Sequence, residues 1–286
     1  MMSYEFQSFS KENIDHYFLM LSKELKKEFG RNAEIELVVV GGAAVLLNYG
    51  FRNSTMDIDA IVASHSSIKD AVNRVSDICG LPNGWINSDF QKTKSYSPKL
   101  IAHSKFYKKY NQTLVVRTVA AEYLIAMKLS SLRPYKYDRS DIVGIIQTQD
   151  SNNFITKERV DNAVRELYGG WENLPKEAQS IIDKIYDDIN NKELYSIIRN
   201  EEIGNKELLI DFENKYGNVL DEENLEDILK KISEHKQAEN KGVERKSIKL
   251  RLEEAQQKAD EYNAHRDQDS QVHITESHKE KHESTR

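Results

Sequence analysis

The sequence has few features of a secreted or membrane protein. It contains one cysteine, Cys79, which excludes an intramolecular disulfide bond and fits a reducing compartment; we expect it to be a buried structural thiol. No run of 18 apolar residues is present that could span a membrane. The first residues, MMSYEFQSFSKEN, lack the basic segment and the following apolar segment of a signal peptide. We therefore expect a cytoplasmic protein without a membrane partner.

The chain also lacks an excess of positive charge. Its net charge is −6 and its isoelectric point is about 5.8, which argues against a surface that is basic throughout and coats nucleic acid. A local basic channel is compatible with these values. With 38% hydrophobic residues, the 286-residue chain can bury a substantial core, in one large or two small domains.

Hydrophobic periodicity divides the chain into three parts. Residues 1–148 mix strand and helix patterns, and residues 149–234 are helical throughout. Residues 235–286 hold 11 Lys or Arg and 11 Asp or Glu residues with a single aromatic residue, so this tail is predicted to be disordered or a single helix. The predicted fold class is α/β (α+β), with a small mixed sheet flanked by helices, then a helical domain and the charged tail.

Apolar patterns and turn residues predict the individual elements. Strands are predicted at Ile35–Val40, Asp57–Val62, Lys99–Phe106 and Thr113–Val119, the last two separated by a turn at Lys108–Asn111. Helices are predicted from Ser10 to Gly30, and at Ala43–Asn48, Ser66–Cys79, Ala120–Leu132, Thr156–Tyr168, Pro175–Asn190, Lys192–Ile198, Lys206–Tyr216 and Leu225–Ile232. Another helix begins near Asp141, with Ser140 or Asp138 as its cap, and Trp85 is expected in the core.

The rest of the chain is organised around residues 37–63. The β-branched run Val38-Val39-Val40 predicts a buried strand, and Gly41-Gly42 follows it with a backbone that can turn sharply and approach a ligand closely. In the next strand, Asp57 and Asp59 are two residues apart and therefore face the same way. Two carboxylates beside a glycine turn could bind a hard divalent cation such as Mg²⁺ or Mn²⁺.

This pattern resembles the DNA polymerase β-like nucleotidyltransferase superfamily. A strand, the turn Gly41-Gly42, a short helix and the carboxylates Asp57 and Asp59 form the signature, with Arg52 in the approach to the carboxylates. Thr55 lies in the same approach, and the similarity extends over residues 35–146. Within the superfamily, the chain is most similar to the bacterial AbiEii-like nucleotidyltransferases of toxin–antitoxin systems.

The resemblance implies an activity and roles for these residues. It implies transfer of a nucleoside monophosphate from a nucleoside triphosphate (NTP) to a hydroxyl group, with Asp57 and Asp59 as metal ligands. Gly41 and Gly42 would donate N–H groups to the phosphates, and Arg52 and Thr55 would belong to the nucleotide site. The acceptor would be tRNA, another nucleic acid or a protein, such as a cognate toxin or antitoxin.

Two residues further along the chain also match the family pattern. Lys128 can be a snorkelling lysine whose stem covers apolar surface, or, as the resemblance implies, a catalytic residue that meets the triphosphate. Asp141 can simply be an acidic residue at a helix N-terminus, or it can hold Lys128 or assist at the metal. The strand Thr113–Val119 has no carboxylate to activate the attacking hydroxyl, so either Asp141 or Asp89 supplies that group or the site is weakened.

Two other interpretations compete with the enzyme. The chain can be a non-catalytic protein that keeps the nucleotidyltransferase fold and binds a partner through its helical region and tail. Alternatively, Asp57 and Asp59 can form a buried structural ion network with Arg52, Arg117 or Lys128.

Overall fold

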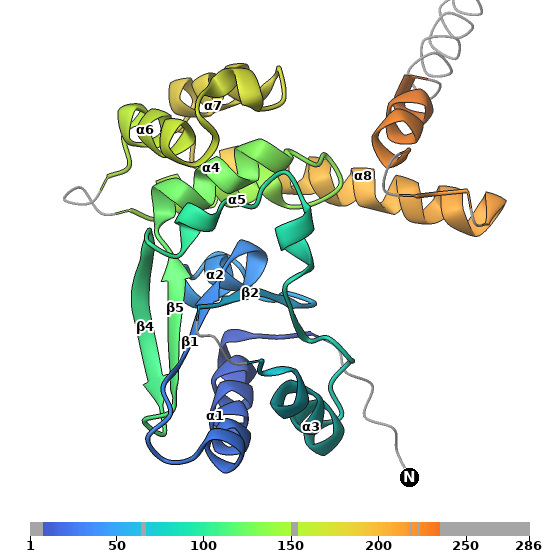
Figure 1. Ribbon diagram of the computed structural model, residues 1–286. Coiled ribbons are helices and arrows are strands. Elements are labelled where there is room, and N and C mark those ends of the chain that lie inside the picture. Colours follow the sequence, from blue (N-terminus) through green and yellow to red (C-terminus); the bar gives the residue numbers. More distant parts are fainter. Residues whose placement is uncertain (1–7, 64–66, 150–153, 218, 222–223, 235–286) are drawn as a thin grey trace, which may run out of the picture. The chain divides into compact units, whose positions relative to one another are not determined.

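A computed structural model of the chain describes residues 8–63, 67–149, 154–217, 219–221 and 224–234. The described part is a mixed α/β structure whose five-stranded sheet is flanked by helices, which confirms the predicted fold class (Figure 1). The chain up to Asn214 forms one compact unit, and a second unit begins at Lys215. The predicted boundary near residue 148 stays a prediction, and the predicted tail at 235–286 lies outside the described residues.

The sheet is built around β1, which is flanked on both sides by other strands. Its strand order is β3-β2-β1-β5-β4. β1 is antiparallel to β2 and parallel to β5, whereas β2 is parallel to β3 and β4 is antiparallel to β5. β2 and β3 are therefore joined by a crossover connection, since a tight turn cannot link parallel strands. The strands are β1 (Ile35–Val39), β2 (Ile58–Val62), β3 (Ile86–Asn87), β4 (Ser104–Tyr110) and β5 (Leu114–Val119).

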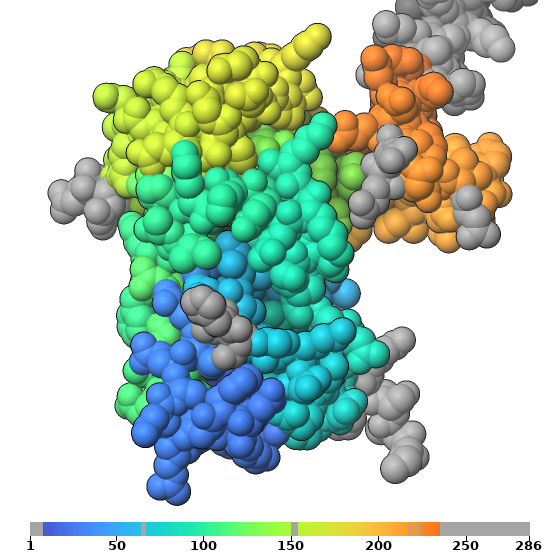
Figure 2. Space-filling model, viewed as in Figure 1, coloured from blue at the N-terminus to red at the C-terminus, as the bar shows by residue number. Residues whose placement is uncertain are grey.

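Eight helices of the described chain pack on the sheet and on one another. They are α1 (Lys11–Phe29), α2 (Gly41–Asn48), α3 (Lys69–Cys79), α4 (Ala121–Ser131), α5 (Asp138–Gln147), α6 (Lys157–Tyr168), α7 (Ala178–Asp187) and α8 (Leu194–Tyr216). α1 packs against α3, β4 and β5, and α2 packs on β2 and β5. α4 contacts α2, α5, α6 and α7. Figure 1 shows α6 and α7 on the side of α4 away from the sheet, and Figure 2 shows their yellow-green to yellow surface at the top of the same view. Residues 225–234, in the second unit, are also helical.

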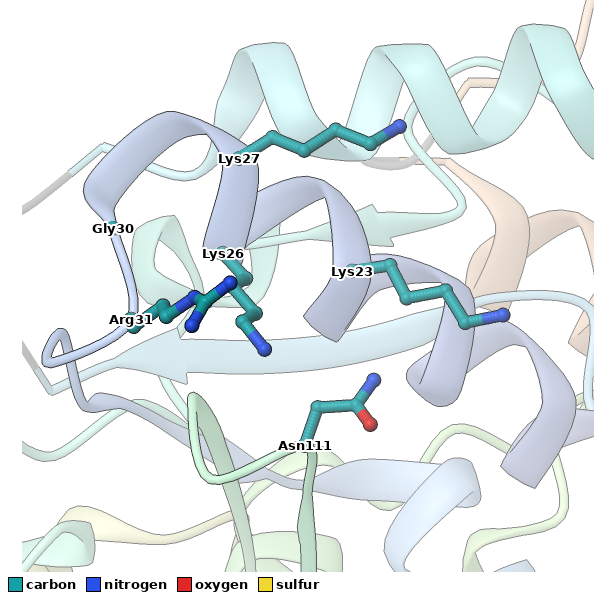
Figure 3. A pocket seen from close by; sticks show the side chains of 6 residues that line it. All are labelled: Lys23, Lys26, Lys27, Gly30, Arg31 and Asn111. Atoms are coloured by element: carbon teal, nitrogen blue, oxygen red, sulfur yellow. The ribbon is translucent and has the colours of Figure 1, made fainter.

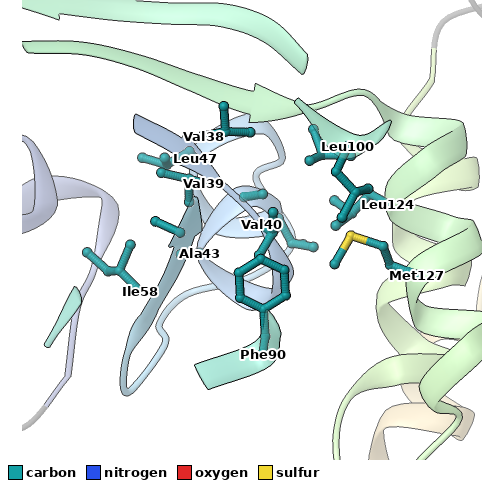
Figure 4. Packing of buried hydrophobic residues seen from close by; sticks show 14 of the residues in the cluster. Val38, Val39, Val40, Ala43, Leu47, Ile58, Phe90, Leu100, Leu124 and Met127 are labelled. Carbon is teal, nitrogen blue, oxygen red and sulfur yellow. The ribbon is translucent and has the colours of Figure 1, made fainter. Parts of the chain in front are cut away.

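The core lies around the predicted buried strand. Val38, Val39 and Val40 are at most 1% exposed, and Figure 4 shows them packed among side chains from α2, α4 and the segment before β4. Trp85 is buried as predicted, and its indole N–H donates to the carbonyl oxygen of Val72 at 3.1 Å. Cys79 is a free thiol that is only half-buried, so its side chain is less enclosed than predicted.

The predicted strand Lys99–Phe106 and the turn after it are wrong. Residues 98–100 form a short 3₁₀ helix, and β4 runs instead from Ser104 through the predicted turn at Lys108–Asn111 as far as Tyr110. The chain reverses at Asn111 and Gln112, which have positive φ angles of 46° and 60°. Lys108 and Lys109 lie in the strand opposite Val116 and Val115 of β5, and their ammonium groups also pair with Asp15 and Glu34, at 2.6 and 2.5 Å.

The two helices predicted at Lys192–Ile198 and Lys206–Tyr216 are one continuous helix. α8 runs through Gly204, where the sequence pattern indicated a break. A glycine in a helix interior costs about 1 kcal/mol relative to alanine. Burial of Ile198 and Leu209 on either side of Gly204 outweighs this cost. None of the described helices is long and apolar enough to cross a membrane.

We predict that Gly144→Ala destabilises the protein because α5 has no room for a methyl group at this position. A Cβ atom at Gly144 would lie 2.6 Å from the ring of Phe51. Overpacking of this kind costs roughly 1–3 kcal/mol, which urea unfolding followed by circular dichroism will measure. Gly204→Ala is the matched control, since no atom lies within 4 Å of its Cβ position. The control should be neutral or stabilising by up to about 1 kcal/mol, and equal stability of the two variants would contradict the prediction.

Candidate active site

The two carboxylates of the predicted metal site lie at the beginning of β2. Asp57 is exposed and immediately precedes the strand, and Asp59 is half-buried within it. Gly41 has a φ angle of +59°, and a Cβ atom there would lie 3.2 Å from Oδ2 of Asp59. The backbone N–H of Val40 also donates to the carbonyl oxygen of Asp59 at 2.9 Å. The glycine turn and the carboxylate are thus in contact.

Burial and negative charge perturb Asp59. Removal of its carboxyl from water, followed by repulsion from Asp57, raises the pKa of Asp59 to about 6, although Arg133 and Lys136 act in the opposite direction. Among the described residues, no cationic side chain forms an ion pair with Asp57 or Asp59. A carboxylate pair that is close together, partly buried and without a cation is suited to hold one.

The predicted structural ion network does not form. Arg117 pairs with Glu36, with Nε 3.0 Å from Oε1. Arg52 and Lys128 both pair with Asp141 instead of the β2 carboxylates. The interpretation of Asp57 and Asp59 as partners of these three cations is therefore wrong.

Arg52 joins the glycine turn to Asp141. Its Nη1 donates to Oδ2 of Asp141 at 2.5 Å, and its Nε donates to the carbonyl oxygen of Ser54 at 3.1 Å. Its Nη2 lies so close to α2 that a Cβ atom at Gly42 would be 2.6 Å away. Gly42 therefore provides the space that the guanidinium occupies at the start of α2. The side chain of Arg52 is only 10% exposed, so it is not a solvated loop arginine.

Lys128 is buried between two carboxylates of α5. Its Nζ lies 2.8 Å from Oδ2 of Asp141 and 3.1 Å from Oδ1 of Asp138. Burial alone would raise the pKa of Asp138, but Lys128 and Arg133 outweigh burial and lower it below its ordinary value. Lys128 is thus held by ion pairs with two carboxylates. Its ammonium group is therefore more restricted in position than that of a snorkelling lysine, which extends into solvent.

Helix α8 completes this network with residues that the sequence analysis missed. The guanidinium of Arg199 lies 3.6 Å from the ring centre of Tyr137, and its Nη1 is 3.9 Å from Oδ1 of Asp141. That oxygen is buried and has no hydrogen-bond donor among the described residues. Arg199 and Glu202 are three residues apart and share a face of α8. Their spacing in the sequence does not indicate that they contact residues near position 141, because these contacts depend on how α8 packs against α5.

The cap of α5 also comes from α8. The helix begins at Asp138, and neither Asp138 nor Ser140 caps it, contrary to the prediction. Instead, the backbone N–H of Arg139 and the hydroxyl of Ser140 donate to the carboxylate of Glu202, at 2.8 and 2.5 Å. Burial raises the pKa of Glu202 to about 7 even though these hydrogen bonds favour the charged form. A carboxylate from another helix replaces a local cap because it also meets the positive end of the α5 dipole.

Thr55 stabilises the backbone next to Asp57. Its hydroxyl donates to the carbonyl oxygen of Asp57 at 3.2 Å, and its backbone pairs with that of Phe9. The buried side chain therefore fixes the backbone that carries Asp57. Its predicted contact with a nucleotide stays a prediction.

Asp141 and Asp89, the two candidates for a third carboxylate, have different environments. Asp141 is fully buried, and its Oδ2 is occupied by Arg52 and Lys128. Asp89 is exposed, pairs with Lys92 at 2.9 Å, and lies close enough for its charge to raise the pKa of Asp59. The described part of the chain contains no cluster of three side chains already arranged around a metal position.

Most of the residues described above lie in a segment of the chain that matches a known protein family. A family model described as "nucleotidyltransferase of unknown function (DUF6036)" matches residues 16–169, more than half of the chain. Searches of curated proteins and of solved structures found no match. The matched segment includes the glycine turn, both β2 carboxylates, Lys128 and Asp141, but it ends before α8.

We predict that Asp59→Asn stabilises the protein at pH 7.5 in the absence of metal. Because folding raises the carboxyl pKa to about 6, the wild type loses stability as the pH rises from about 4 to 6. The amide has no such loss, so its advantage is on the order of 2 kcal/mol above pH 7 and vanishes near pH 4. Urea unfolding at both pH values will measure it, with Asp77→Asn, an exposed carboxylate on α3, as the control. A pH-independent effect of Asp59→Asn would contradict the assigned cause.

Proposed function

Since the chain belongs to the family of nucleotidyltransferases of unknown function, we propose that it transfers a nucleoside monophosphate from an NTP to a hydroxyl group, with Mg²⁺ or Mn²⁺ as cofactor. One observation carries the proposal. The carboxylates of Asp57 and Asp59 have no ion-pair partner among the described residues, Asp59 adjoins Gly41, and the neighbouring Gly42 contacts Arg52. Negative groups for a metal thus lie beside positive groups for phosphates.

The two carboxylates fit a magnesium ion. Mg²⁺ is commonly bound by one or two protein carboxylates together with water and substrate phosphates, so two protein ligands are sufficient. The raised pKa of Asp59 reflects burial and repulsion from Asp57, and a divalent cation would relieve both. Bound by these residues, the ion would neutralise charge on the triphosphate as pyrophosphate leaves.

The surrounding residues would bind and orient the phosphates. The first N–H groups of α2, at Gly41 and Gly42, have no acceptor within the helix and can donate to a phosphate oxygen. Nη2 of Arg52 lies against the same turn. Lys128 has three N–H donors, of which two face Asp138 and Asp141, so one is left for a phosphate. In this proposal Asp141 holds both cations in place and Asp89 is the third carboxylate, which would accept the proton of the attacking hydroxyl.

The acceptor and the biological setting are proposed from the sequence resemblance. The hydroxyl would belong to a nucleic acid, such as the acceptor end of a tRNA, or to a protein. The setting would be a toxin–antitoxin or phage-defence system, with a cognate toxin or antitoxin as partner. The similarity to AbiEii-like proteins in residues 35–146 supports this setting.

We predict metal-dependent transfer that requires both β2 carboxylates. The full chain would be incubated with Mg²⁺, each of four α-³²P-labelled NTPs, bacterial RNA and a lysate. Label should move to RNA or to a protein band, and Asp59→Ala should reduce the rate by about 100-fold or more because several kcal/mol of charge stabilisation are lost. Asp77→Ala, a change of the same charge on α3, should behave as the wild type.

Binding measurements distinguish the proposed enzyme from a non-catalytic binding protein with the same fold. If no NTP gives transfer but the chain binds NTP in calorimetry, the fold acts as a non-catalytic binding protein. If Asp57→Ala/Asp59→Ala transfers label at the wild-type rate, the metal assignment is wrong.

We also predict that Mg²⁺ raises the melting temperature of the wild type but not that of Asp59→Asn. A ligand present at 100 times its dissociation constant stabilises by about 2.7 kcal/mol. The shift should weaken below pH 6, because protons then compete for Asp59. Differential scanning fluorimetry at pH 5 and pH 7.5 will measure it, and an equal shift in both proteins would place the metal elsewhere.

A further inference from the structure

A basic hollow lies at the C-terminal end of α1, away from the carboxylate pair. Its volume is about 460 Å³, and it is lined by Lys23, Lys26, Lys27, Gly30, Arg31 and Asn111. Figure 3 shows Lys26 extending toward Asn111, whereas Lys27 points away from it. Asn111 is fixed in this position, because it lies in the turn between β4 and β5 and its amide donates to the hydroxyl of Ser22 at 2.8 Å. Two distant segments of sequence thus form one positively charged surface.

Three of the four cations of the hollow are not paired with the described carboxylates around them. Glu24 accepts from Lys27 and Arg74, and Glu28 accepts from Arg74 of α3. Glu34, in the loop after α1, pairs with Lys109 at 2.5 Å. In the described part of the chain, no ion pair reaches the remaining cations, which are Lys23, Lys26 and Arg31. Three exposed, unopposed positive charges around one hollow contrast with the net charge of −6 of the whole chain.

Stabilisation of α1 explains only part of this arrangement. Lysines in a last helical turn interact favourably with the helix dipole, by about 0.3–1 kcal/mol each, which accounts for Lys26 and Lys27. It does not account for Arg31, which lies beyond the helix. An open, polar surface of this kind suits the phosphates of a polymer better than a small metabolite, which normally binds in an enclosed and largely apolar pocket.

The hollow and the carboxylates lie at opposite ends of β1. At its first residue, the N–H of Ile35 donates to the carbonyl oxygen of Thr113, just after the turn that carries Asn111. At the other end, Val40 and Gly41 contact Asp59. Five residue steps along a strand cover about 16 Å, so a single nucleotide could not occupy both positions, whereas a polynucleotide could extend between them.

We propose that this hollow binds the backbone phosphates of a single-stranded nucleic-acid segment. Lys23, Lys26 and Arg31 provide the charge, and the amide oxygen of Asn111 can accept from a ribose hydroxyl. β4, which leads into the same turn, also exposes 63% of Phe106, and exposed aromatic rings are typical of surfaces on which unpaired bases stack. That the bound nucleic acid is also the acceptor rests on the proposed function.

The test compares two charge reversals of equal size in the full chain. Binding of a fluorescein-labelled 20-nucleotide single-stranded RNA would be followed by anisotropy between 50 and 300 mM NaCl. Lys26→Glu/Arg31→Glu should weaken binding at least 10-fold. It should also lower the slope of log Kd against log salt by about 1.4, which corresponds to two lost phosphate contacts. Lys176→Glu/Lys184→Glu, at exposed positions near and on α7, should change affinity less than 3-fold.

Each alternative interpretation of the hollow predicts a different result in this binding test. Equal weakening by both charge reversals would show a net-charge effect, and unchanged RNA binding by Lys26→Glu/Arg31→Glu would place the RNA elsewhere; either result overturns the proposal. Binding to vesicles containing 30% phosphatidylserine, with none to RNA, would overturn it in favour of a membrane surface. Asp57→Ala/Asp59→Ala should bind RNA as the wild type does, so loss of transfer and loss of RNA binding are distinguishable. If RNA is the acceptor, Lys26→Glu/Arg31→Glu raises KM for RNA without changing kcat.

Discussion

The carboxylate of Asp141 has no contact with water, and it is surrounded by cations from three other parts of the chain. Arg52 comes from the loop after α2, Lys128 from α4 and Arg199 from α8. Removal of one partner from a buried ion pair typically costs about 3–5 kcal/mol, because the remaining charge is left uncompensated. The relative positions of α4, α5 and the glycine turn therefore depend on this group. Its contact with Arg52 also explains why position 42 has no side chain.

The cations of this cluster are held in place by carboxylates of the chain itself. Arg52, Lys128, Arg133 and Arg199 face two carboxylates, Asp138 and Asp141, so the cations are in excess in this cluster. The carboxylates orient the cations without neutralising them completely. For a triphosphate bound beside Gly41, such a site would require little reorganisation, which is the condition under which electrostatic stabilisation is most effective.

Local signals in the sequence were sufficient to place the glycine turn beside Asp59. The run Val38–Val40, the glycine turn and the spacing of Asp57 and Asp59 each depend on neighbours within about 20 residues, and the structure places the turn against Asp59. The pairing of Arg52 with Asp141 spans 89 residues, so the sequence could indicate both residues but not their contact. The errors arose where packing and strand pairing override local preferences. β4 continues through Lys108 because it pairs with β5, and α8 continues through Gly204 because residues on either side of the glycine are buried.

The parallel pairing of β1 with β5 has a consequence for how the chain acquires its structure. Ile35 lies beside Leu114, although 79 residues separate them. The antiparallel pairing of β1 with β2 closes a much shorter loop, since Val39 lies beside Ala60. Closure of a longer loop costs more entropy and slows folding. During synthesis, β1 can pair with β2 early, but the sheet cannot be completed until β5 has left the ribosome. Until then, one side of β1 is an open edge, and the nascent chain is most prone to aggregate in this interval.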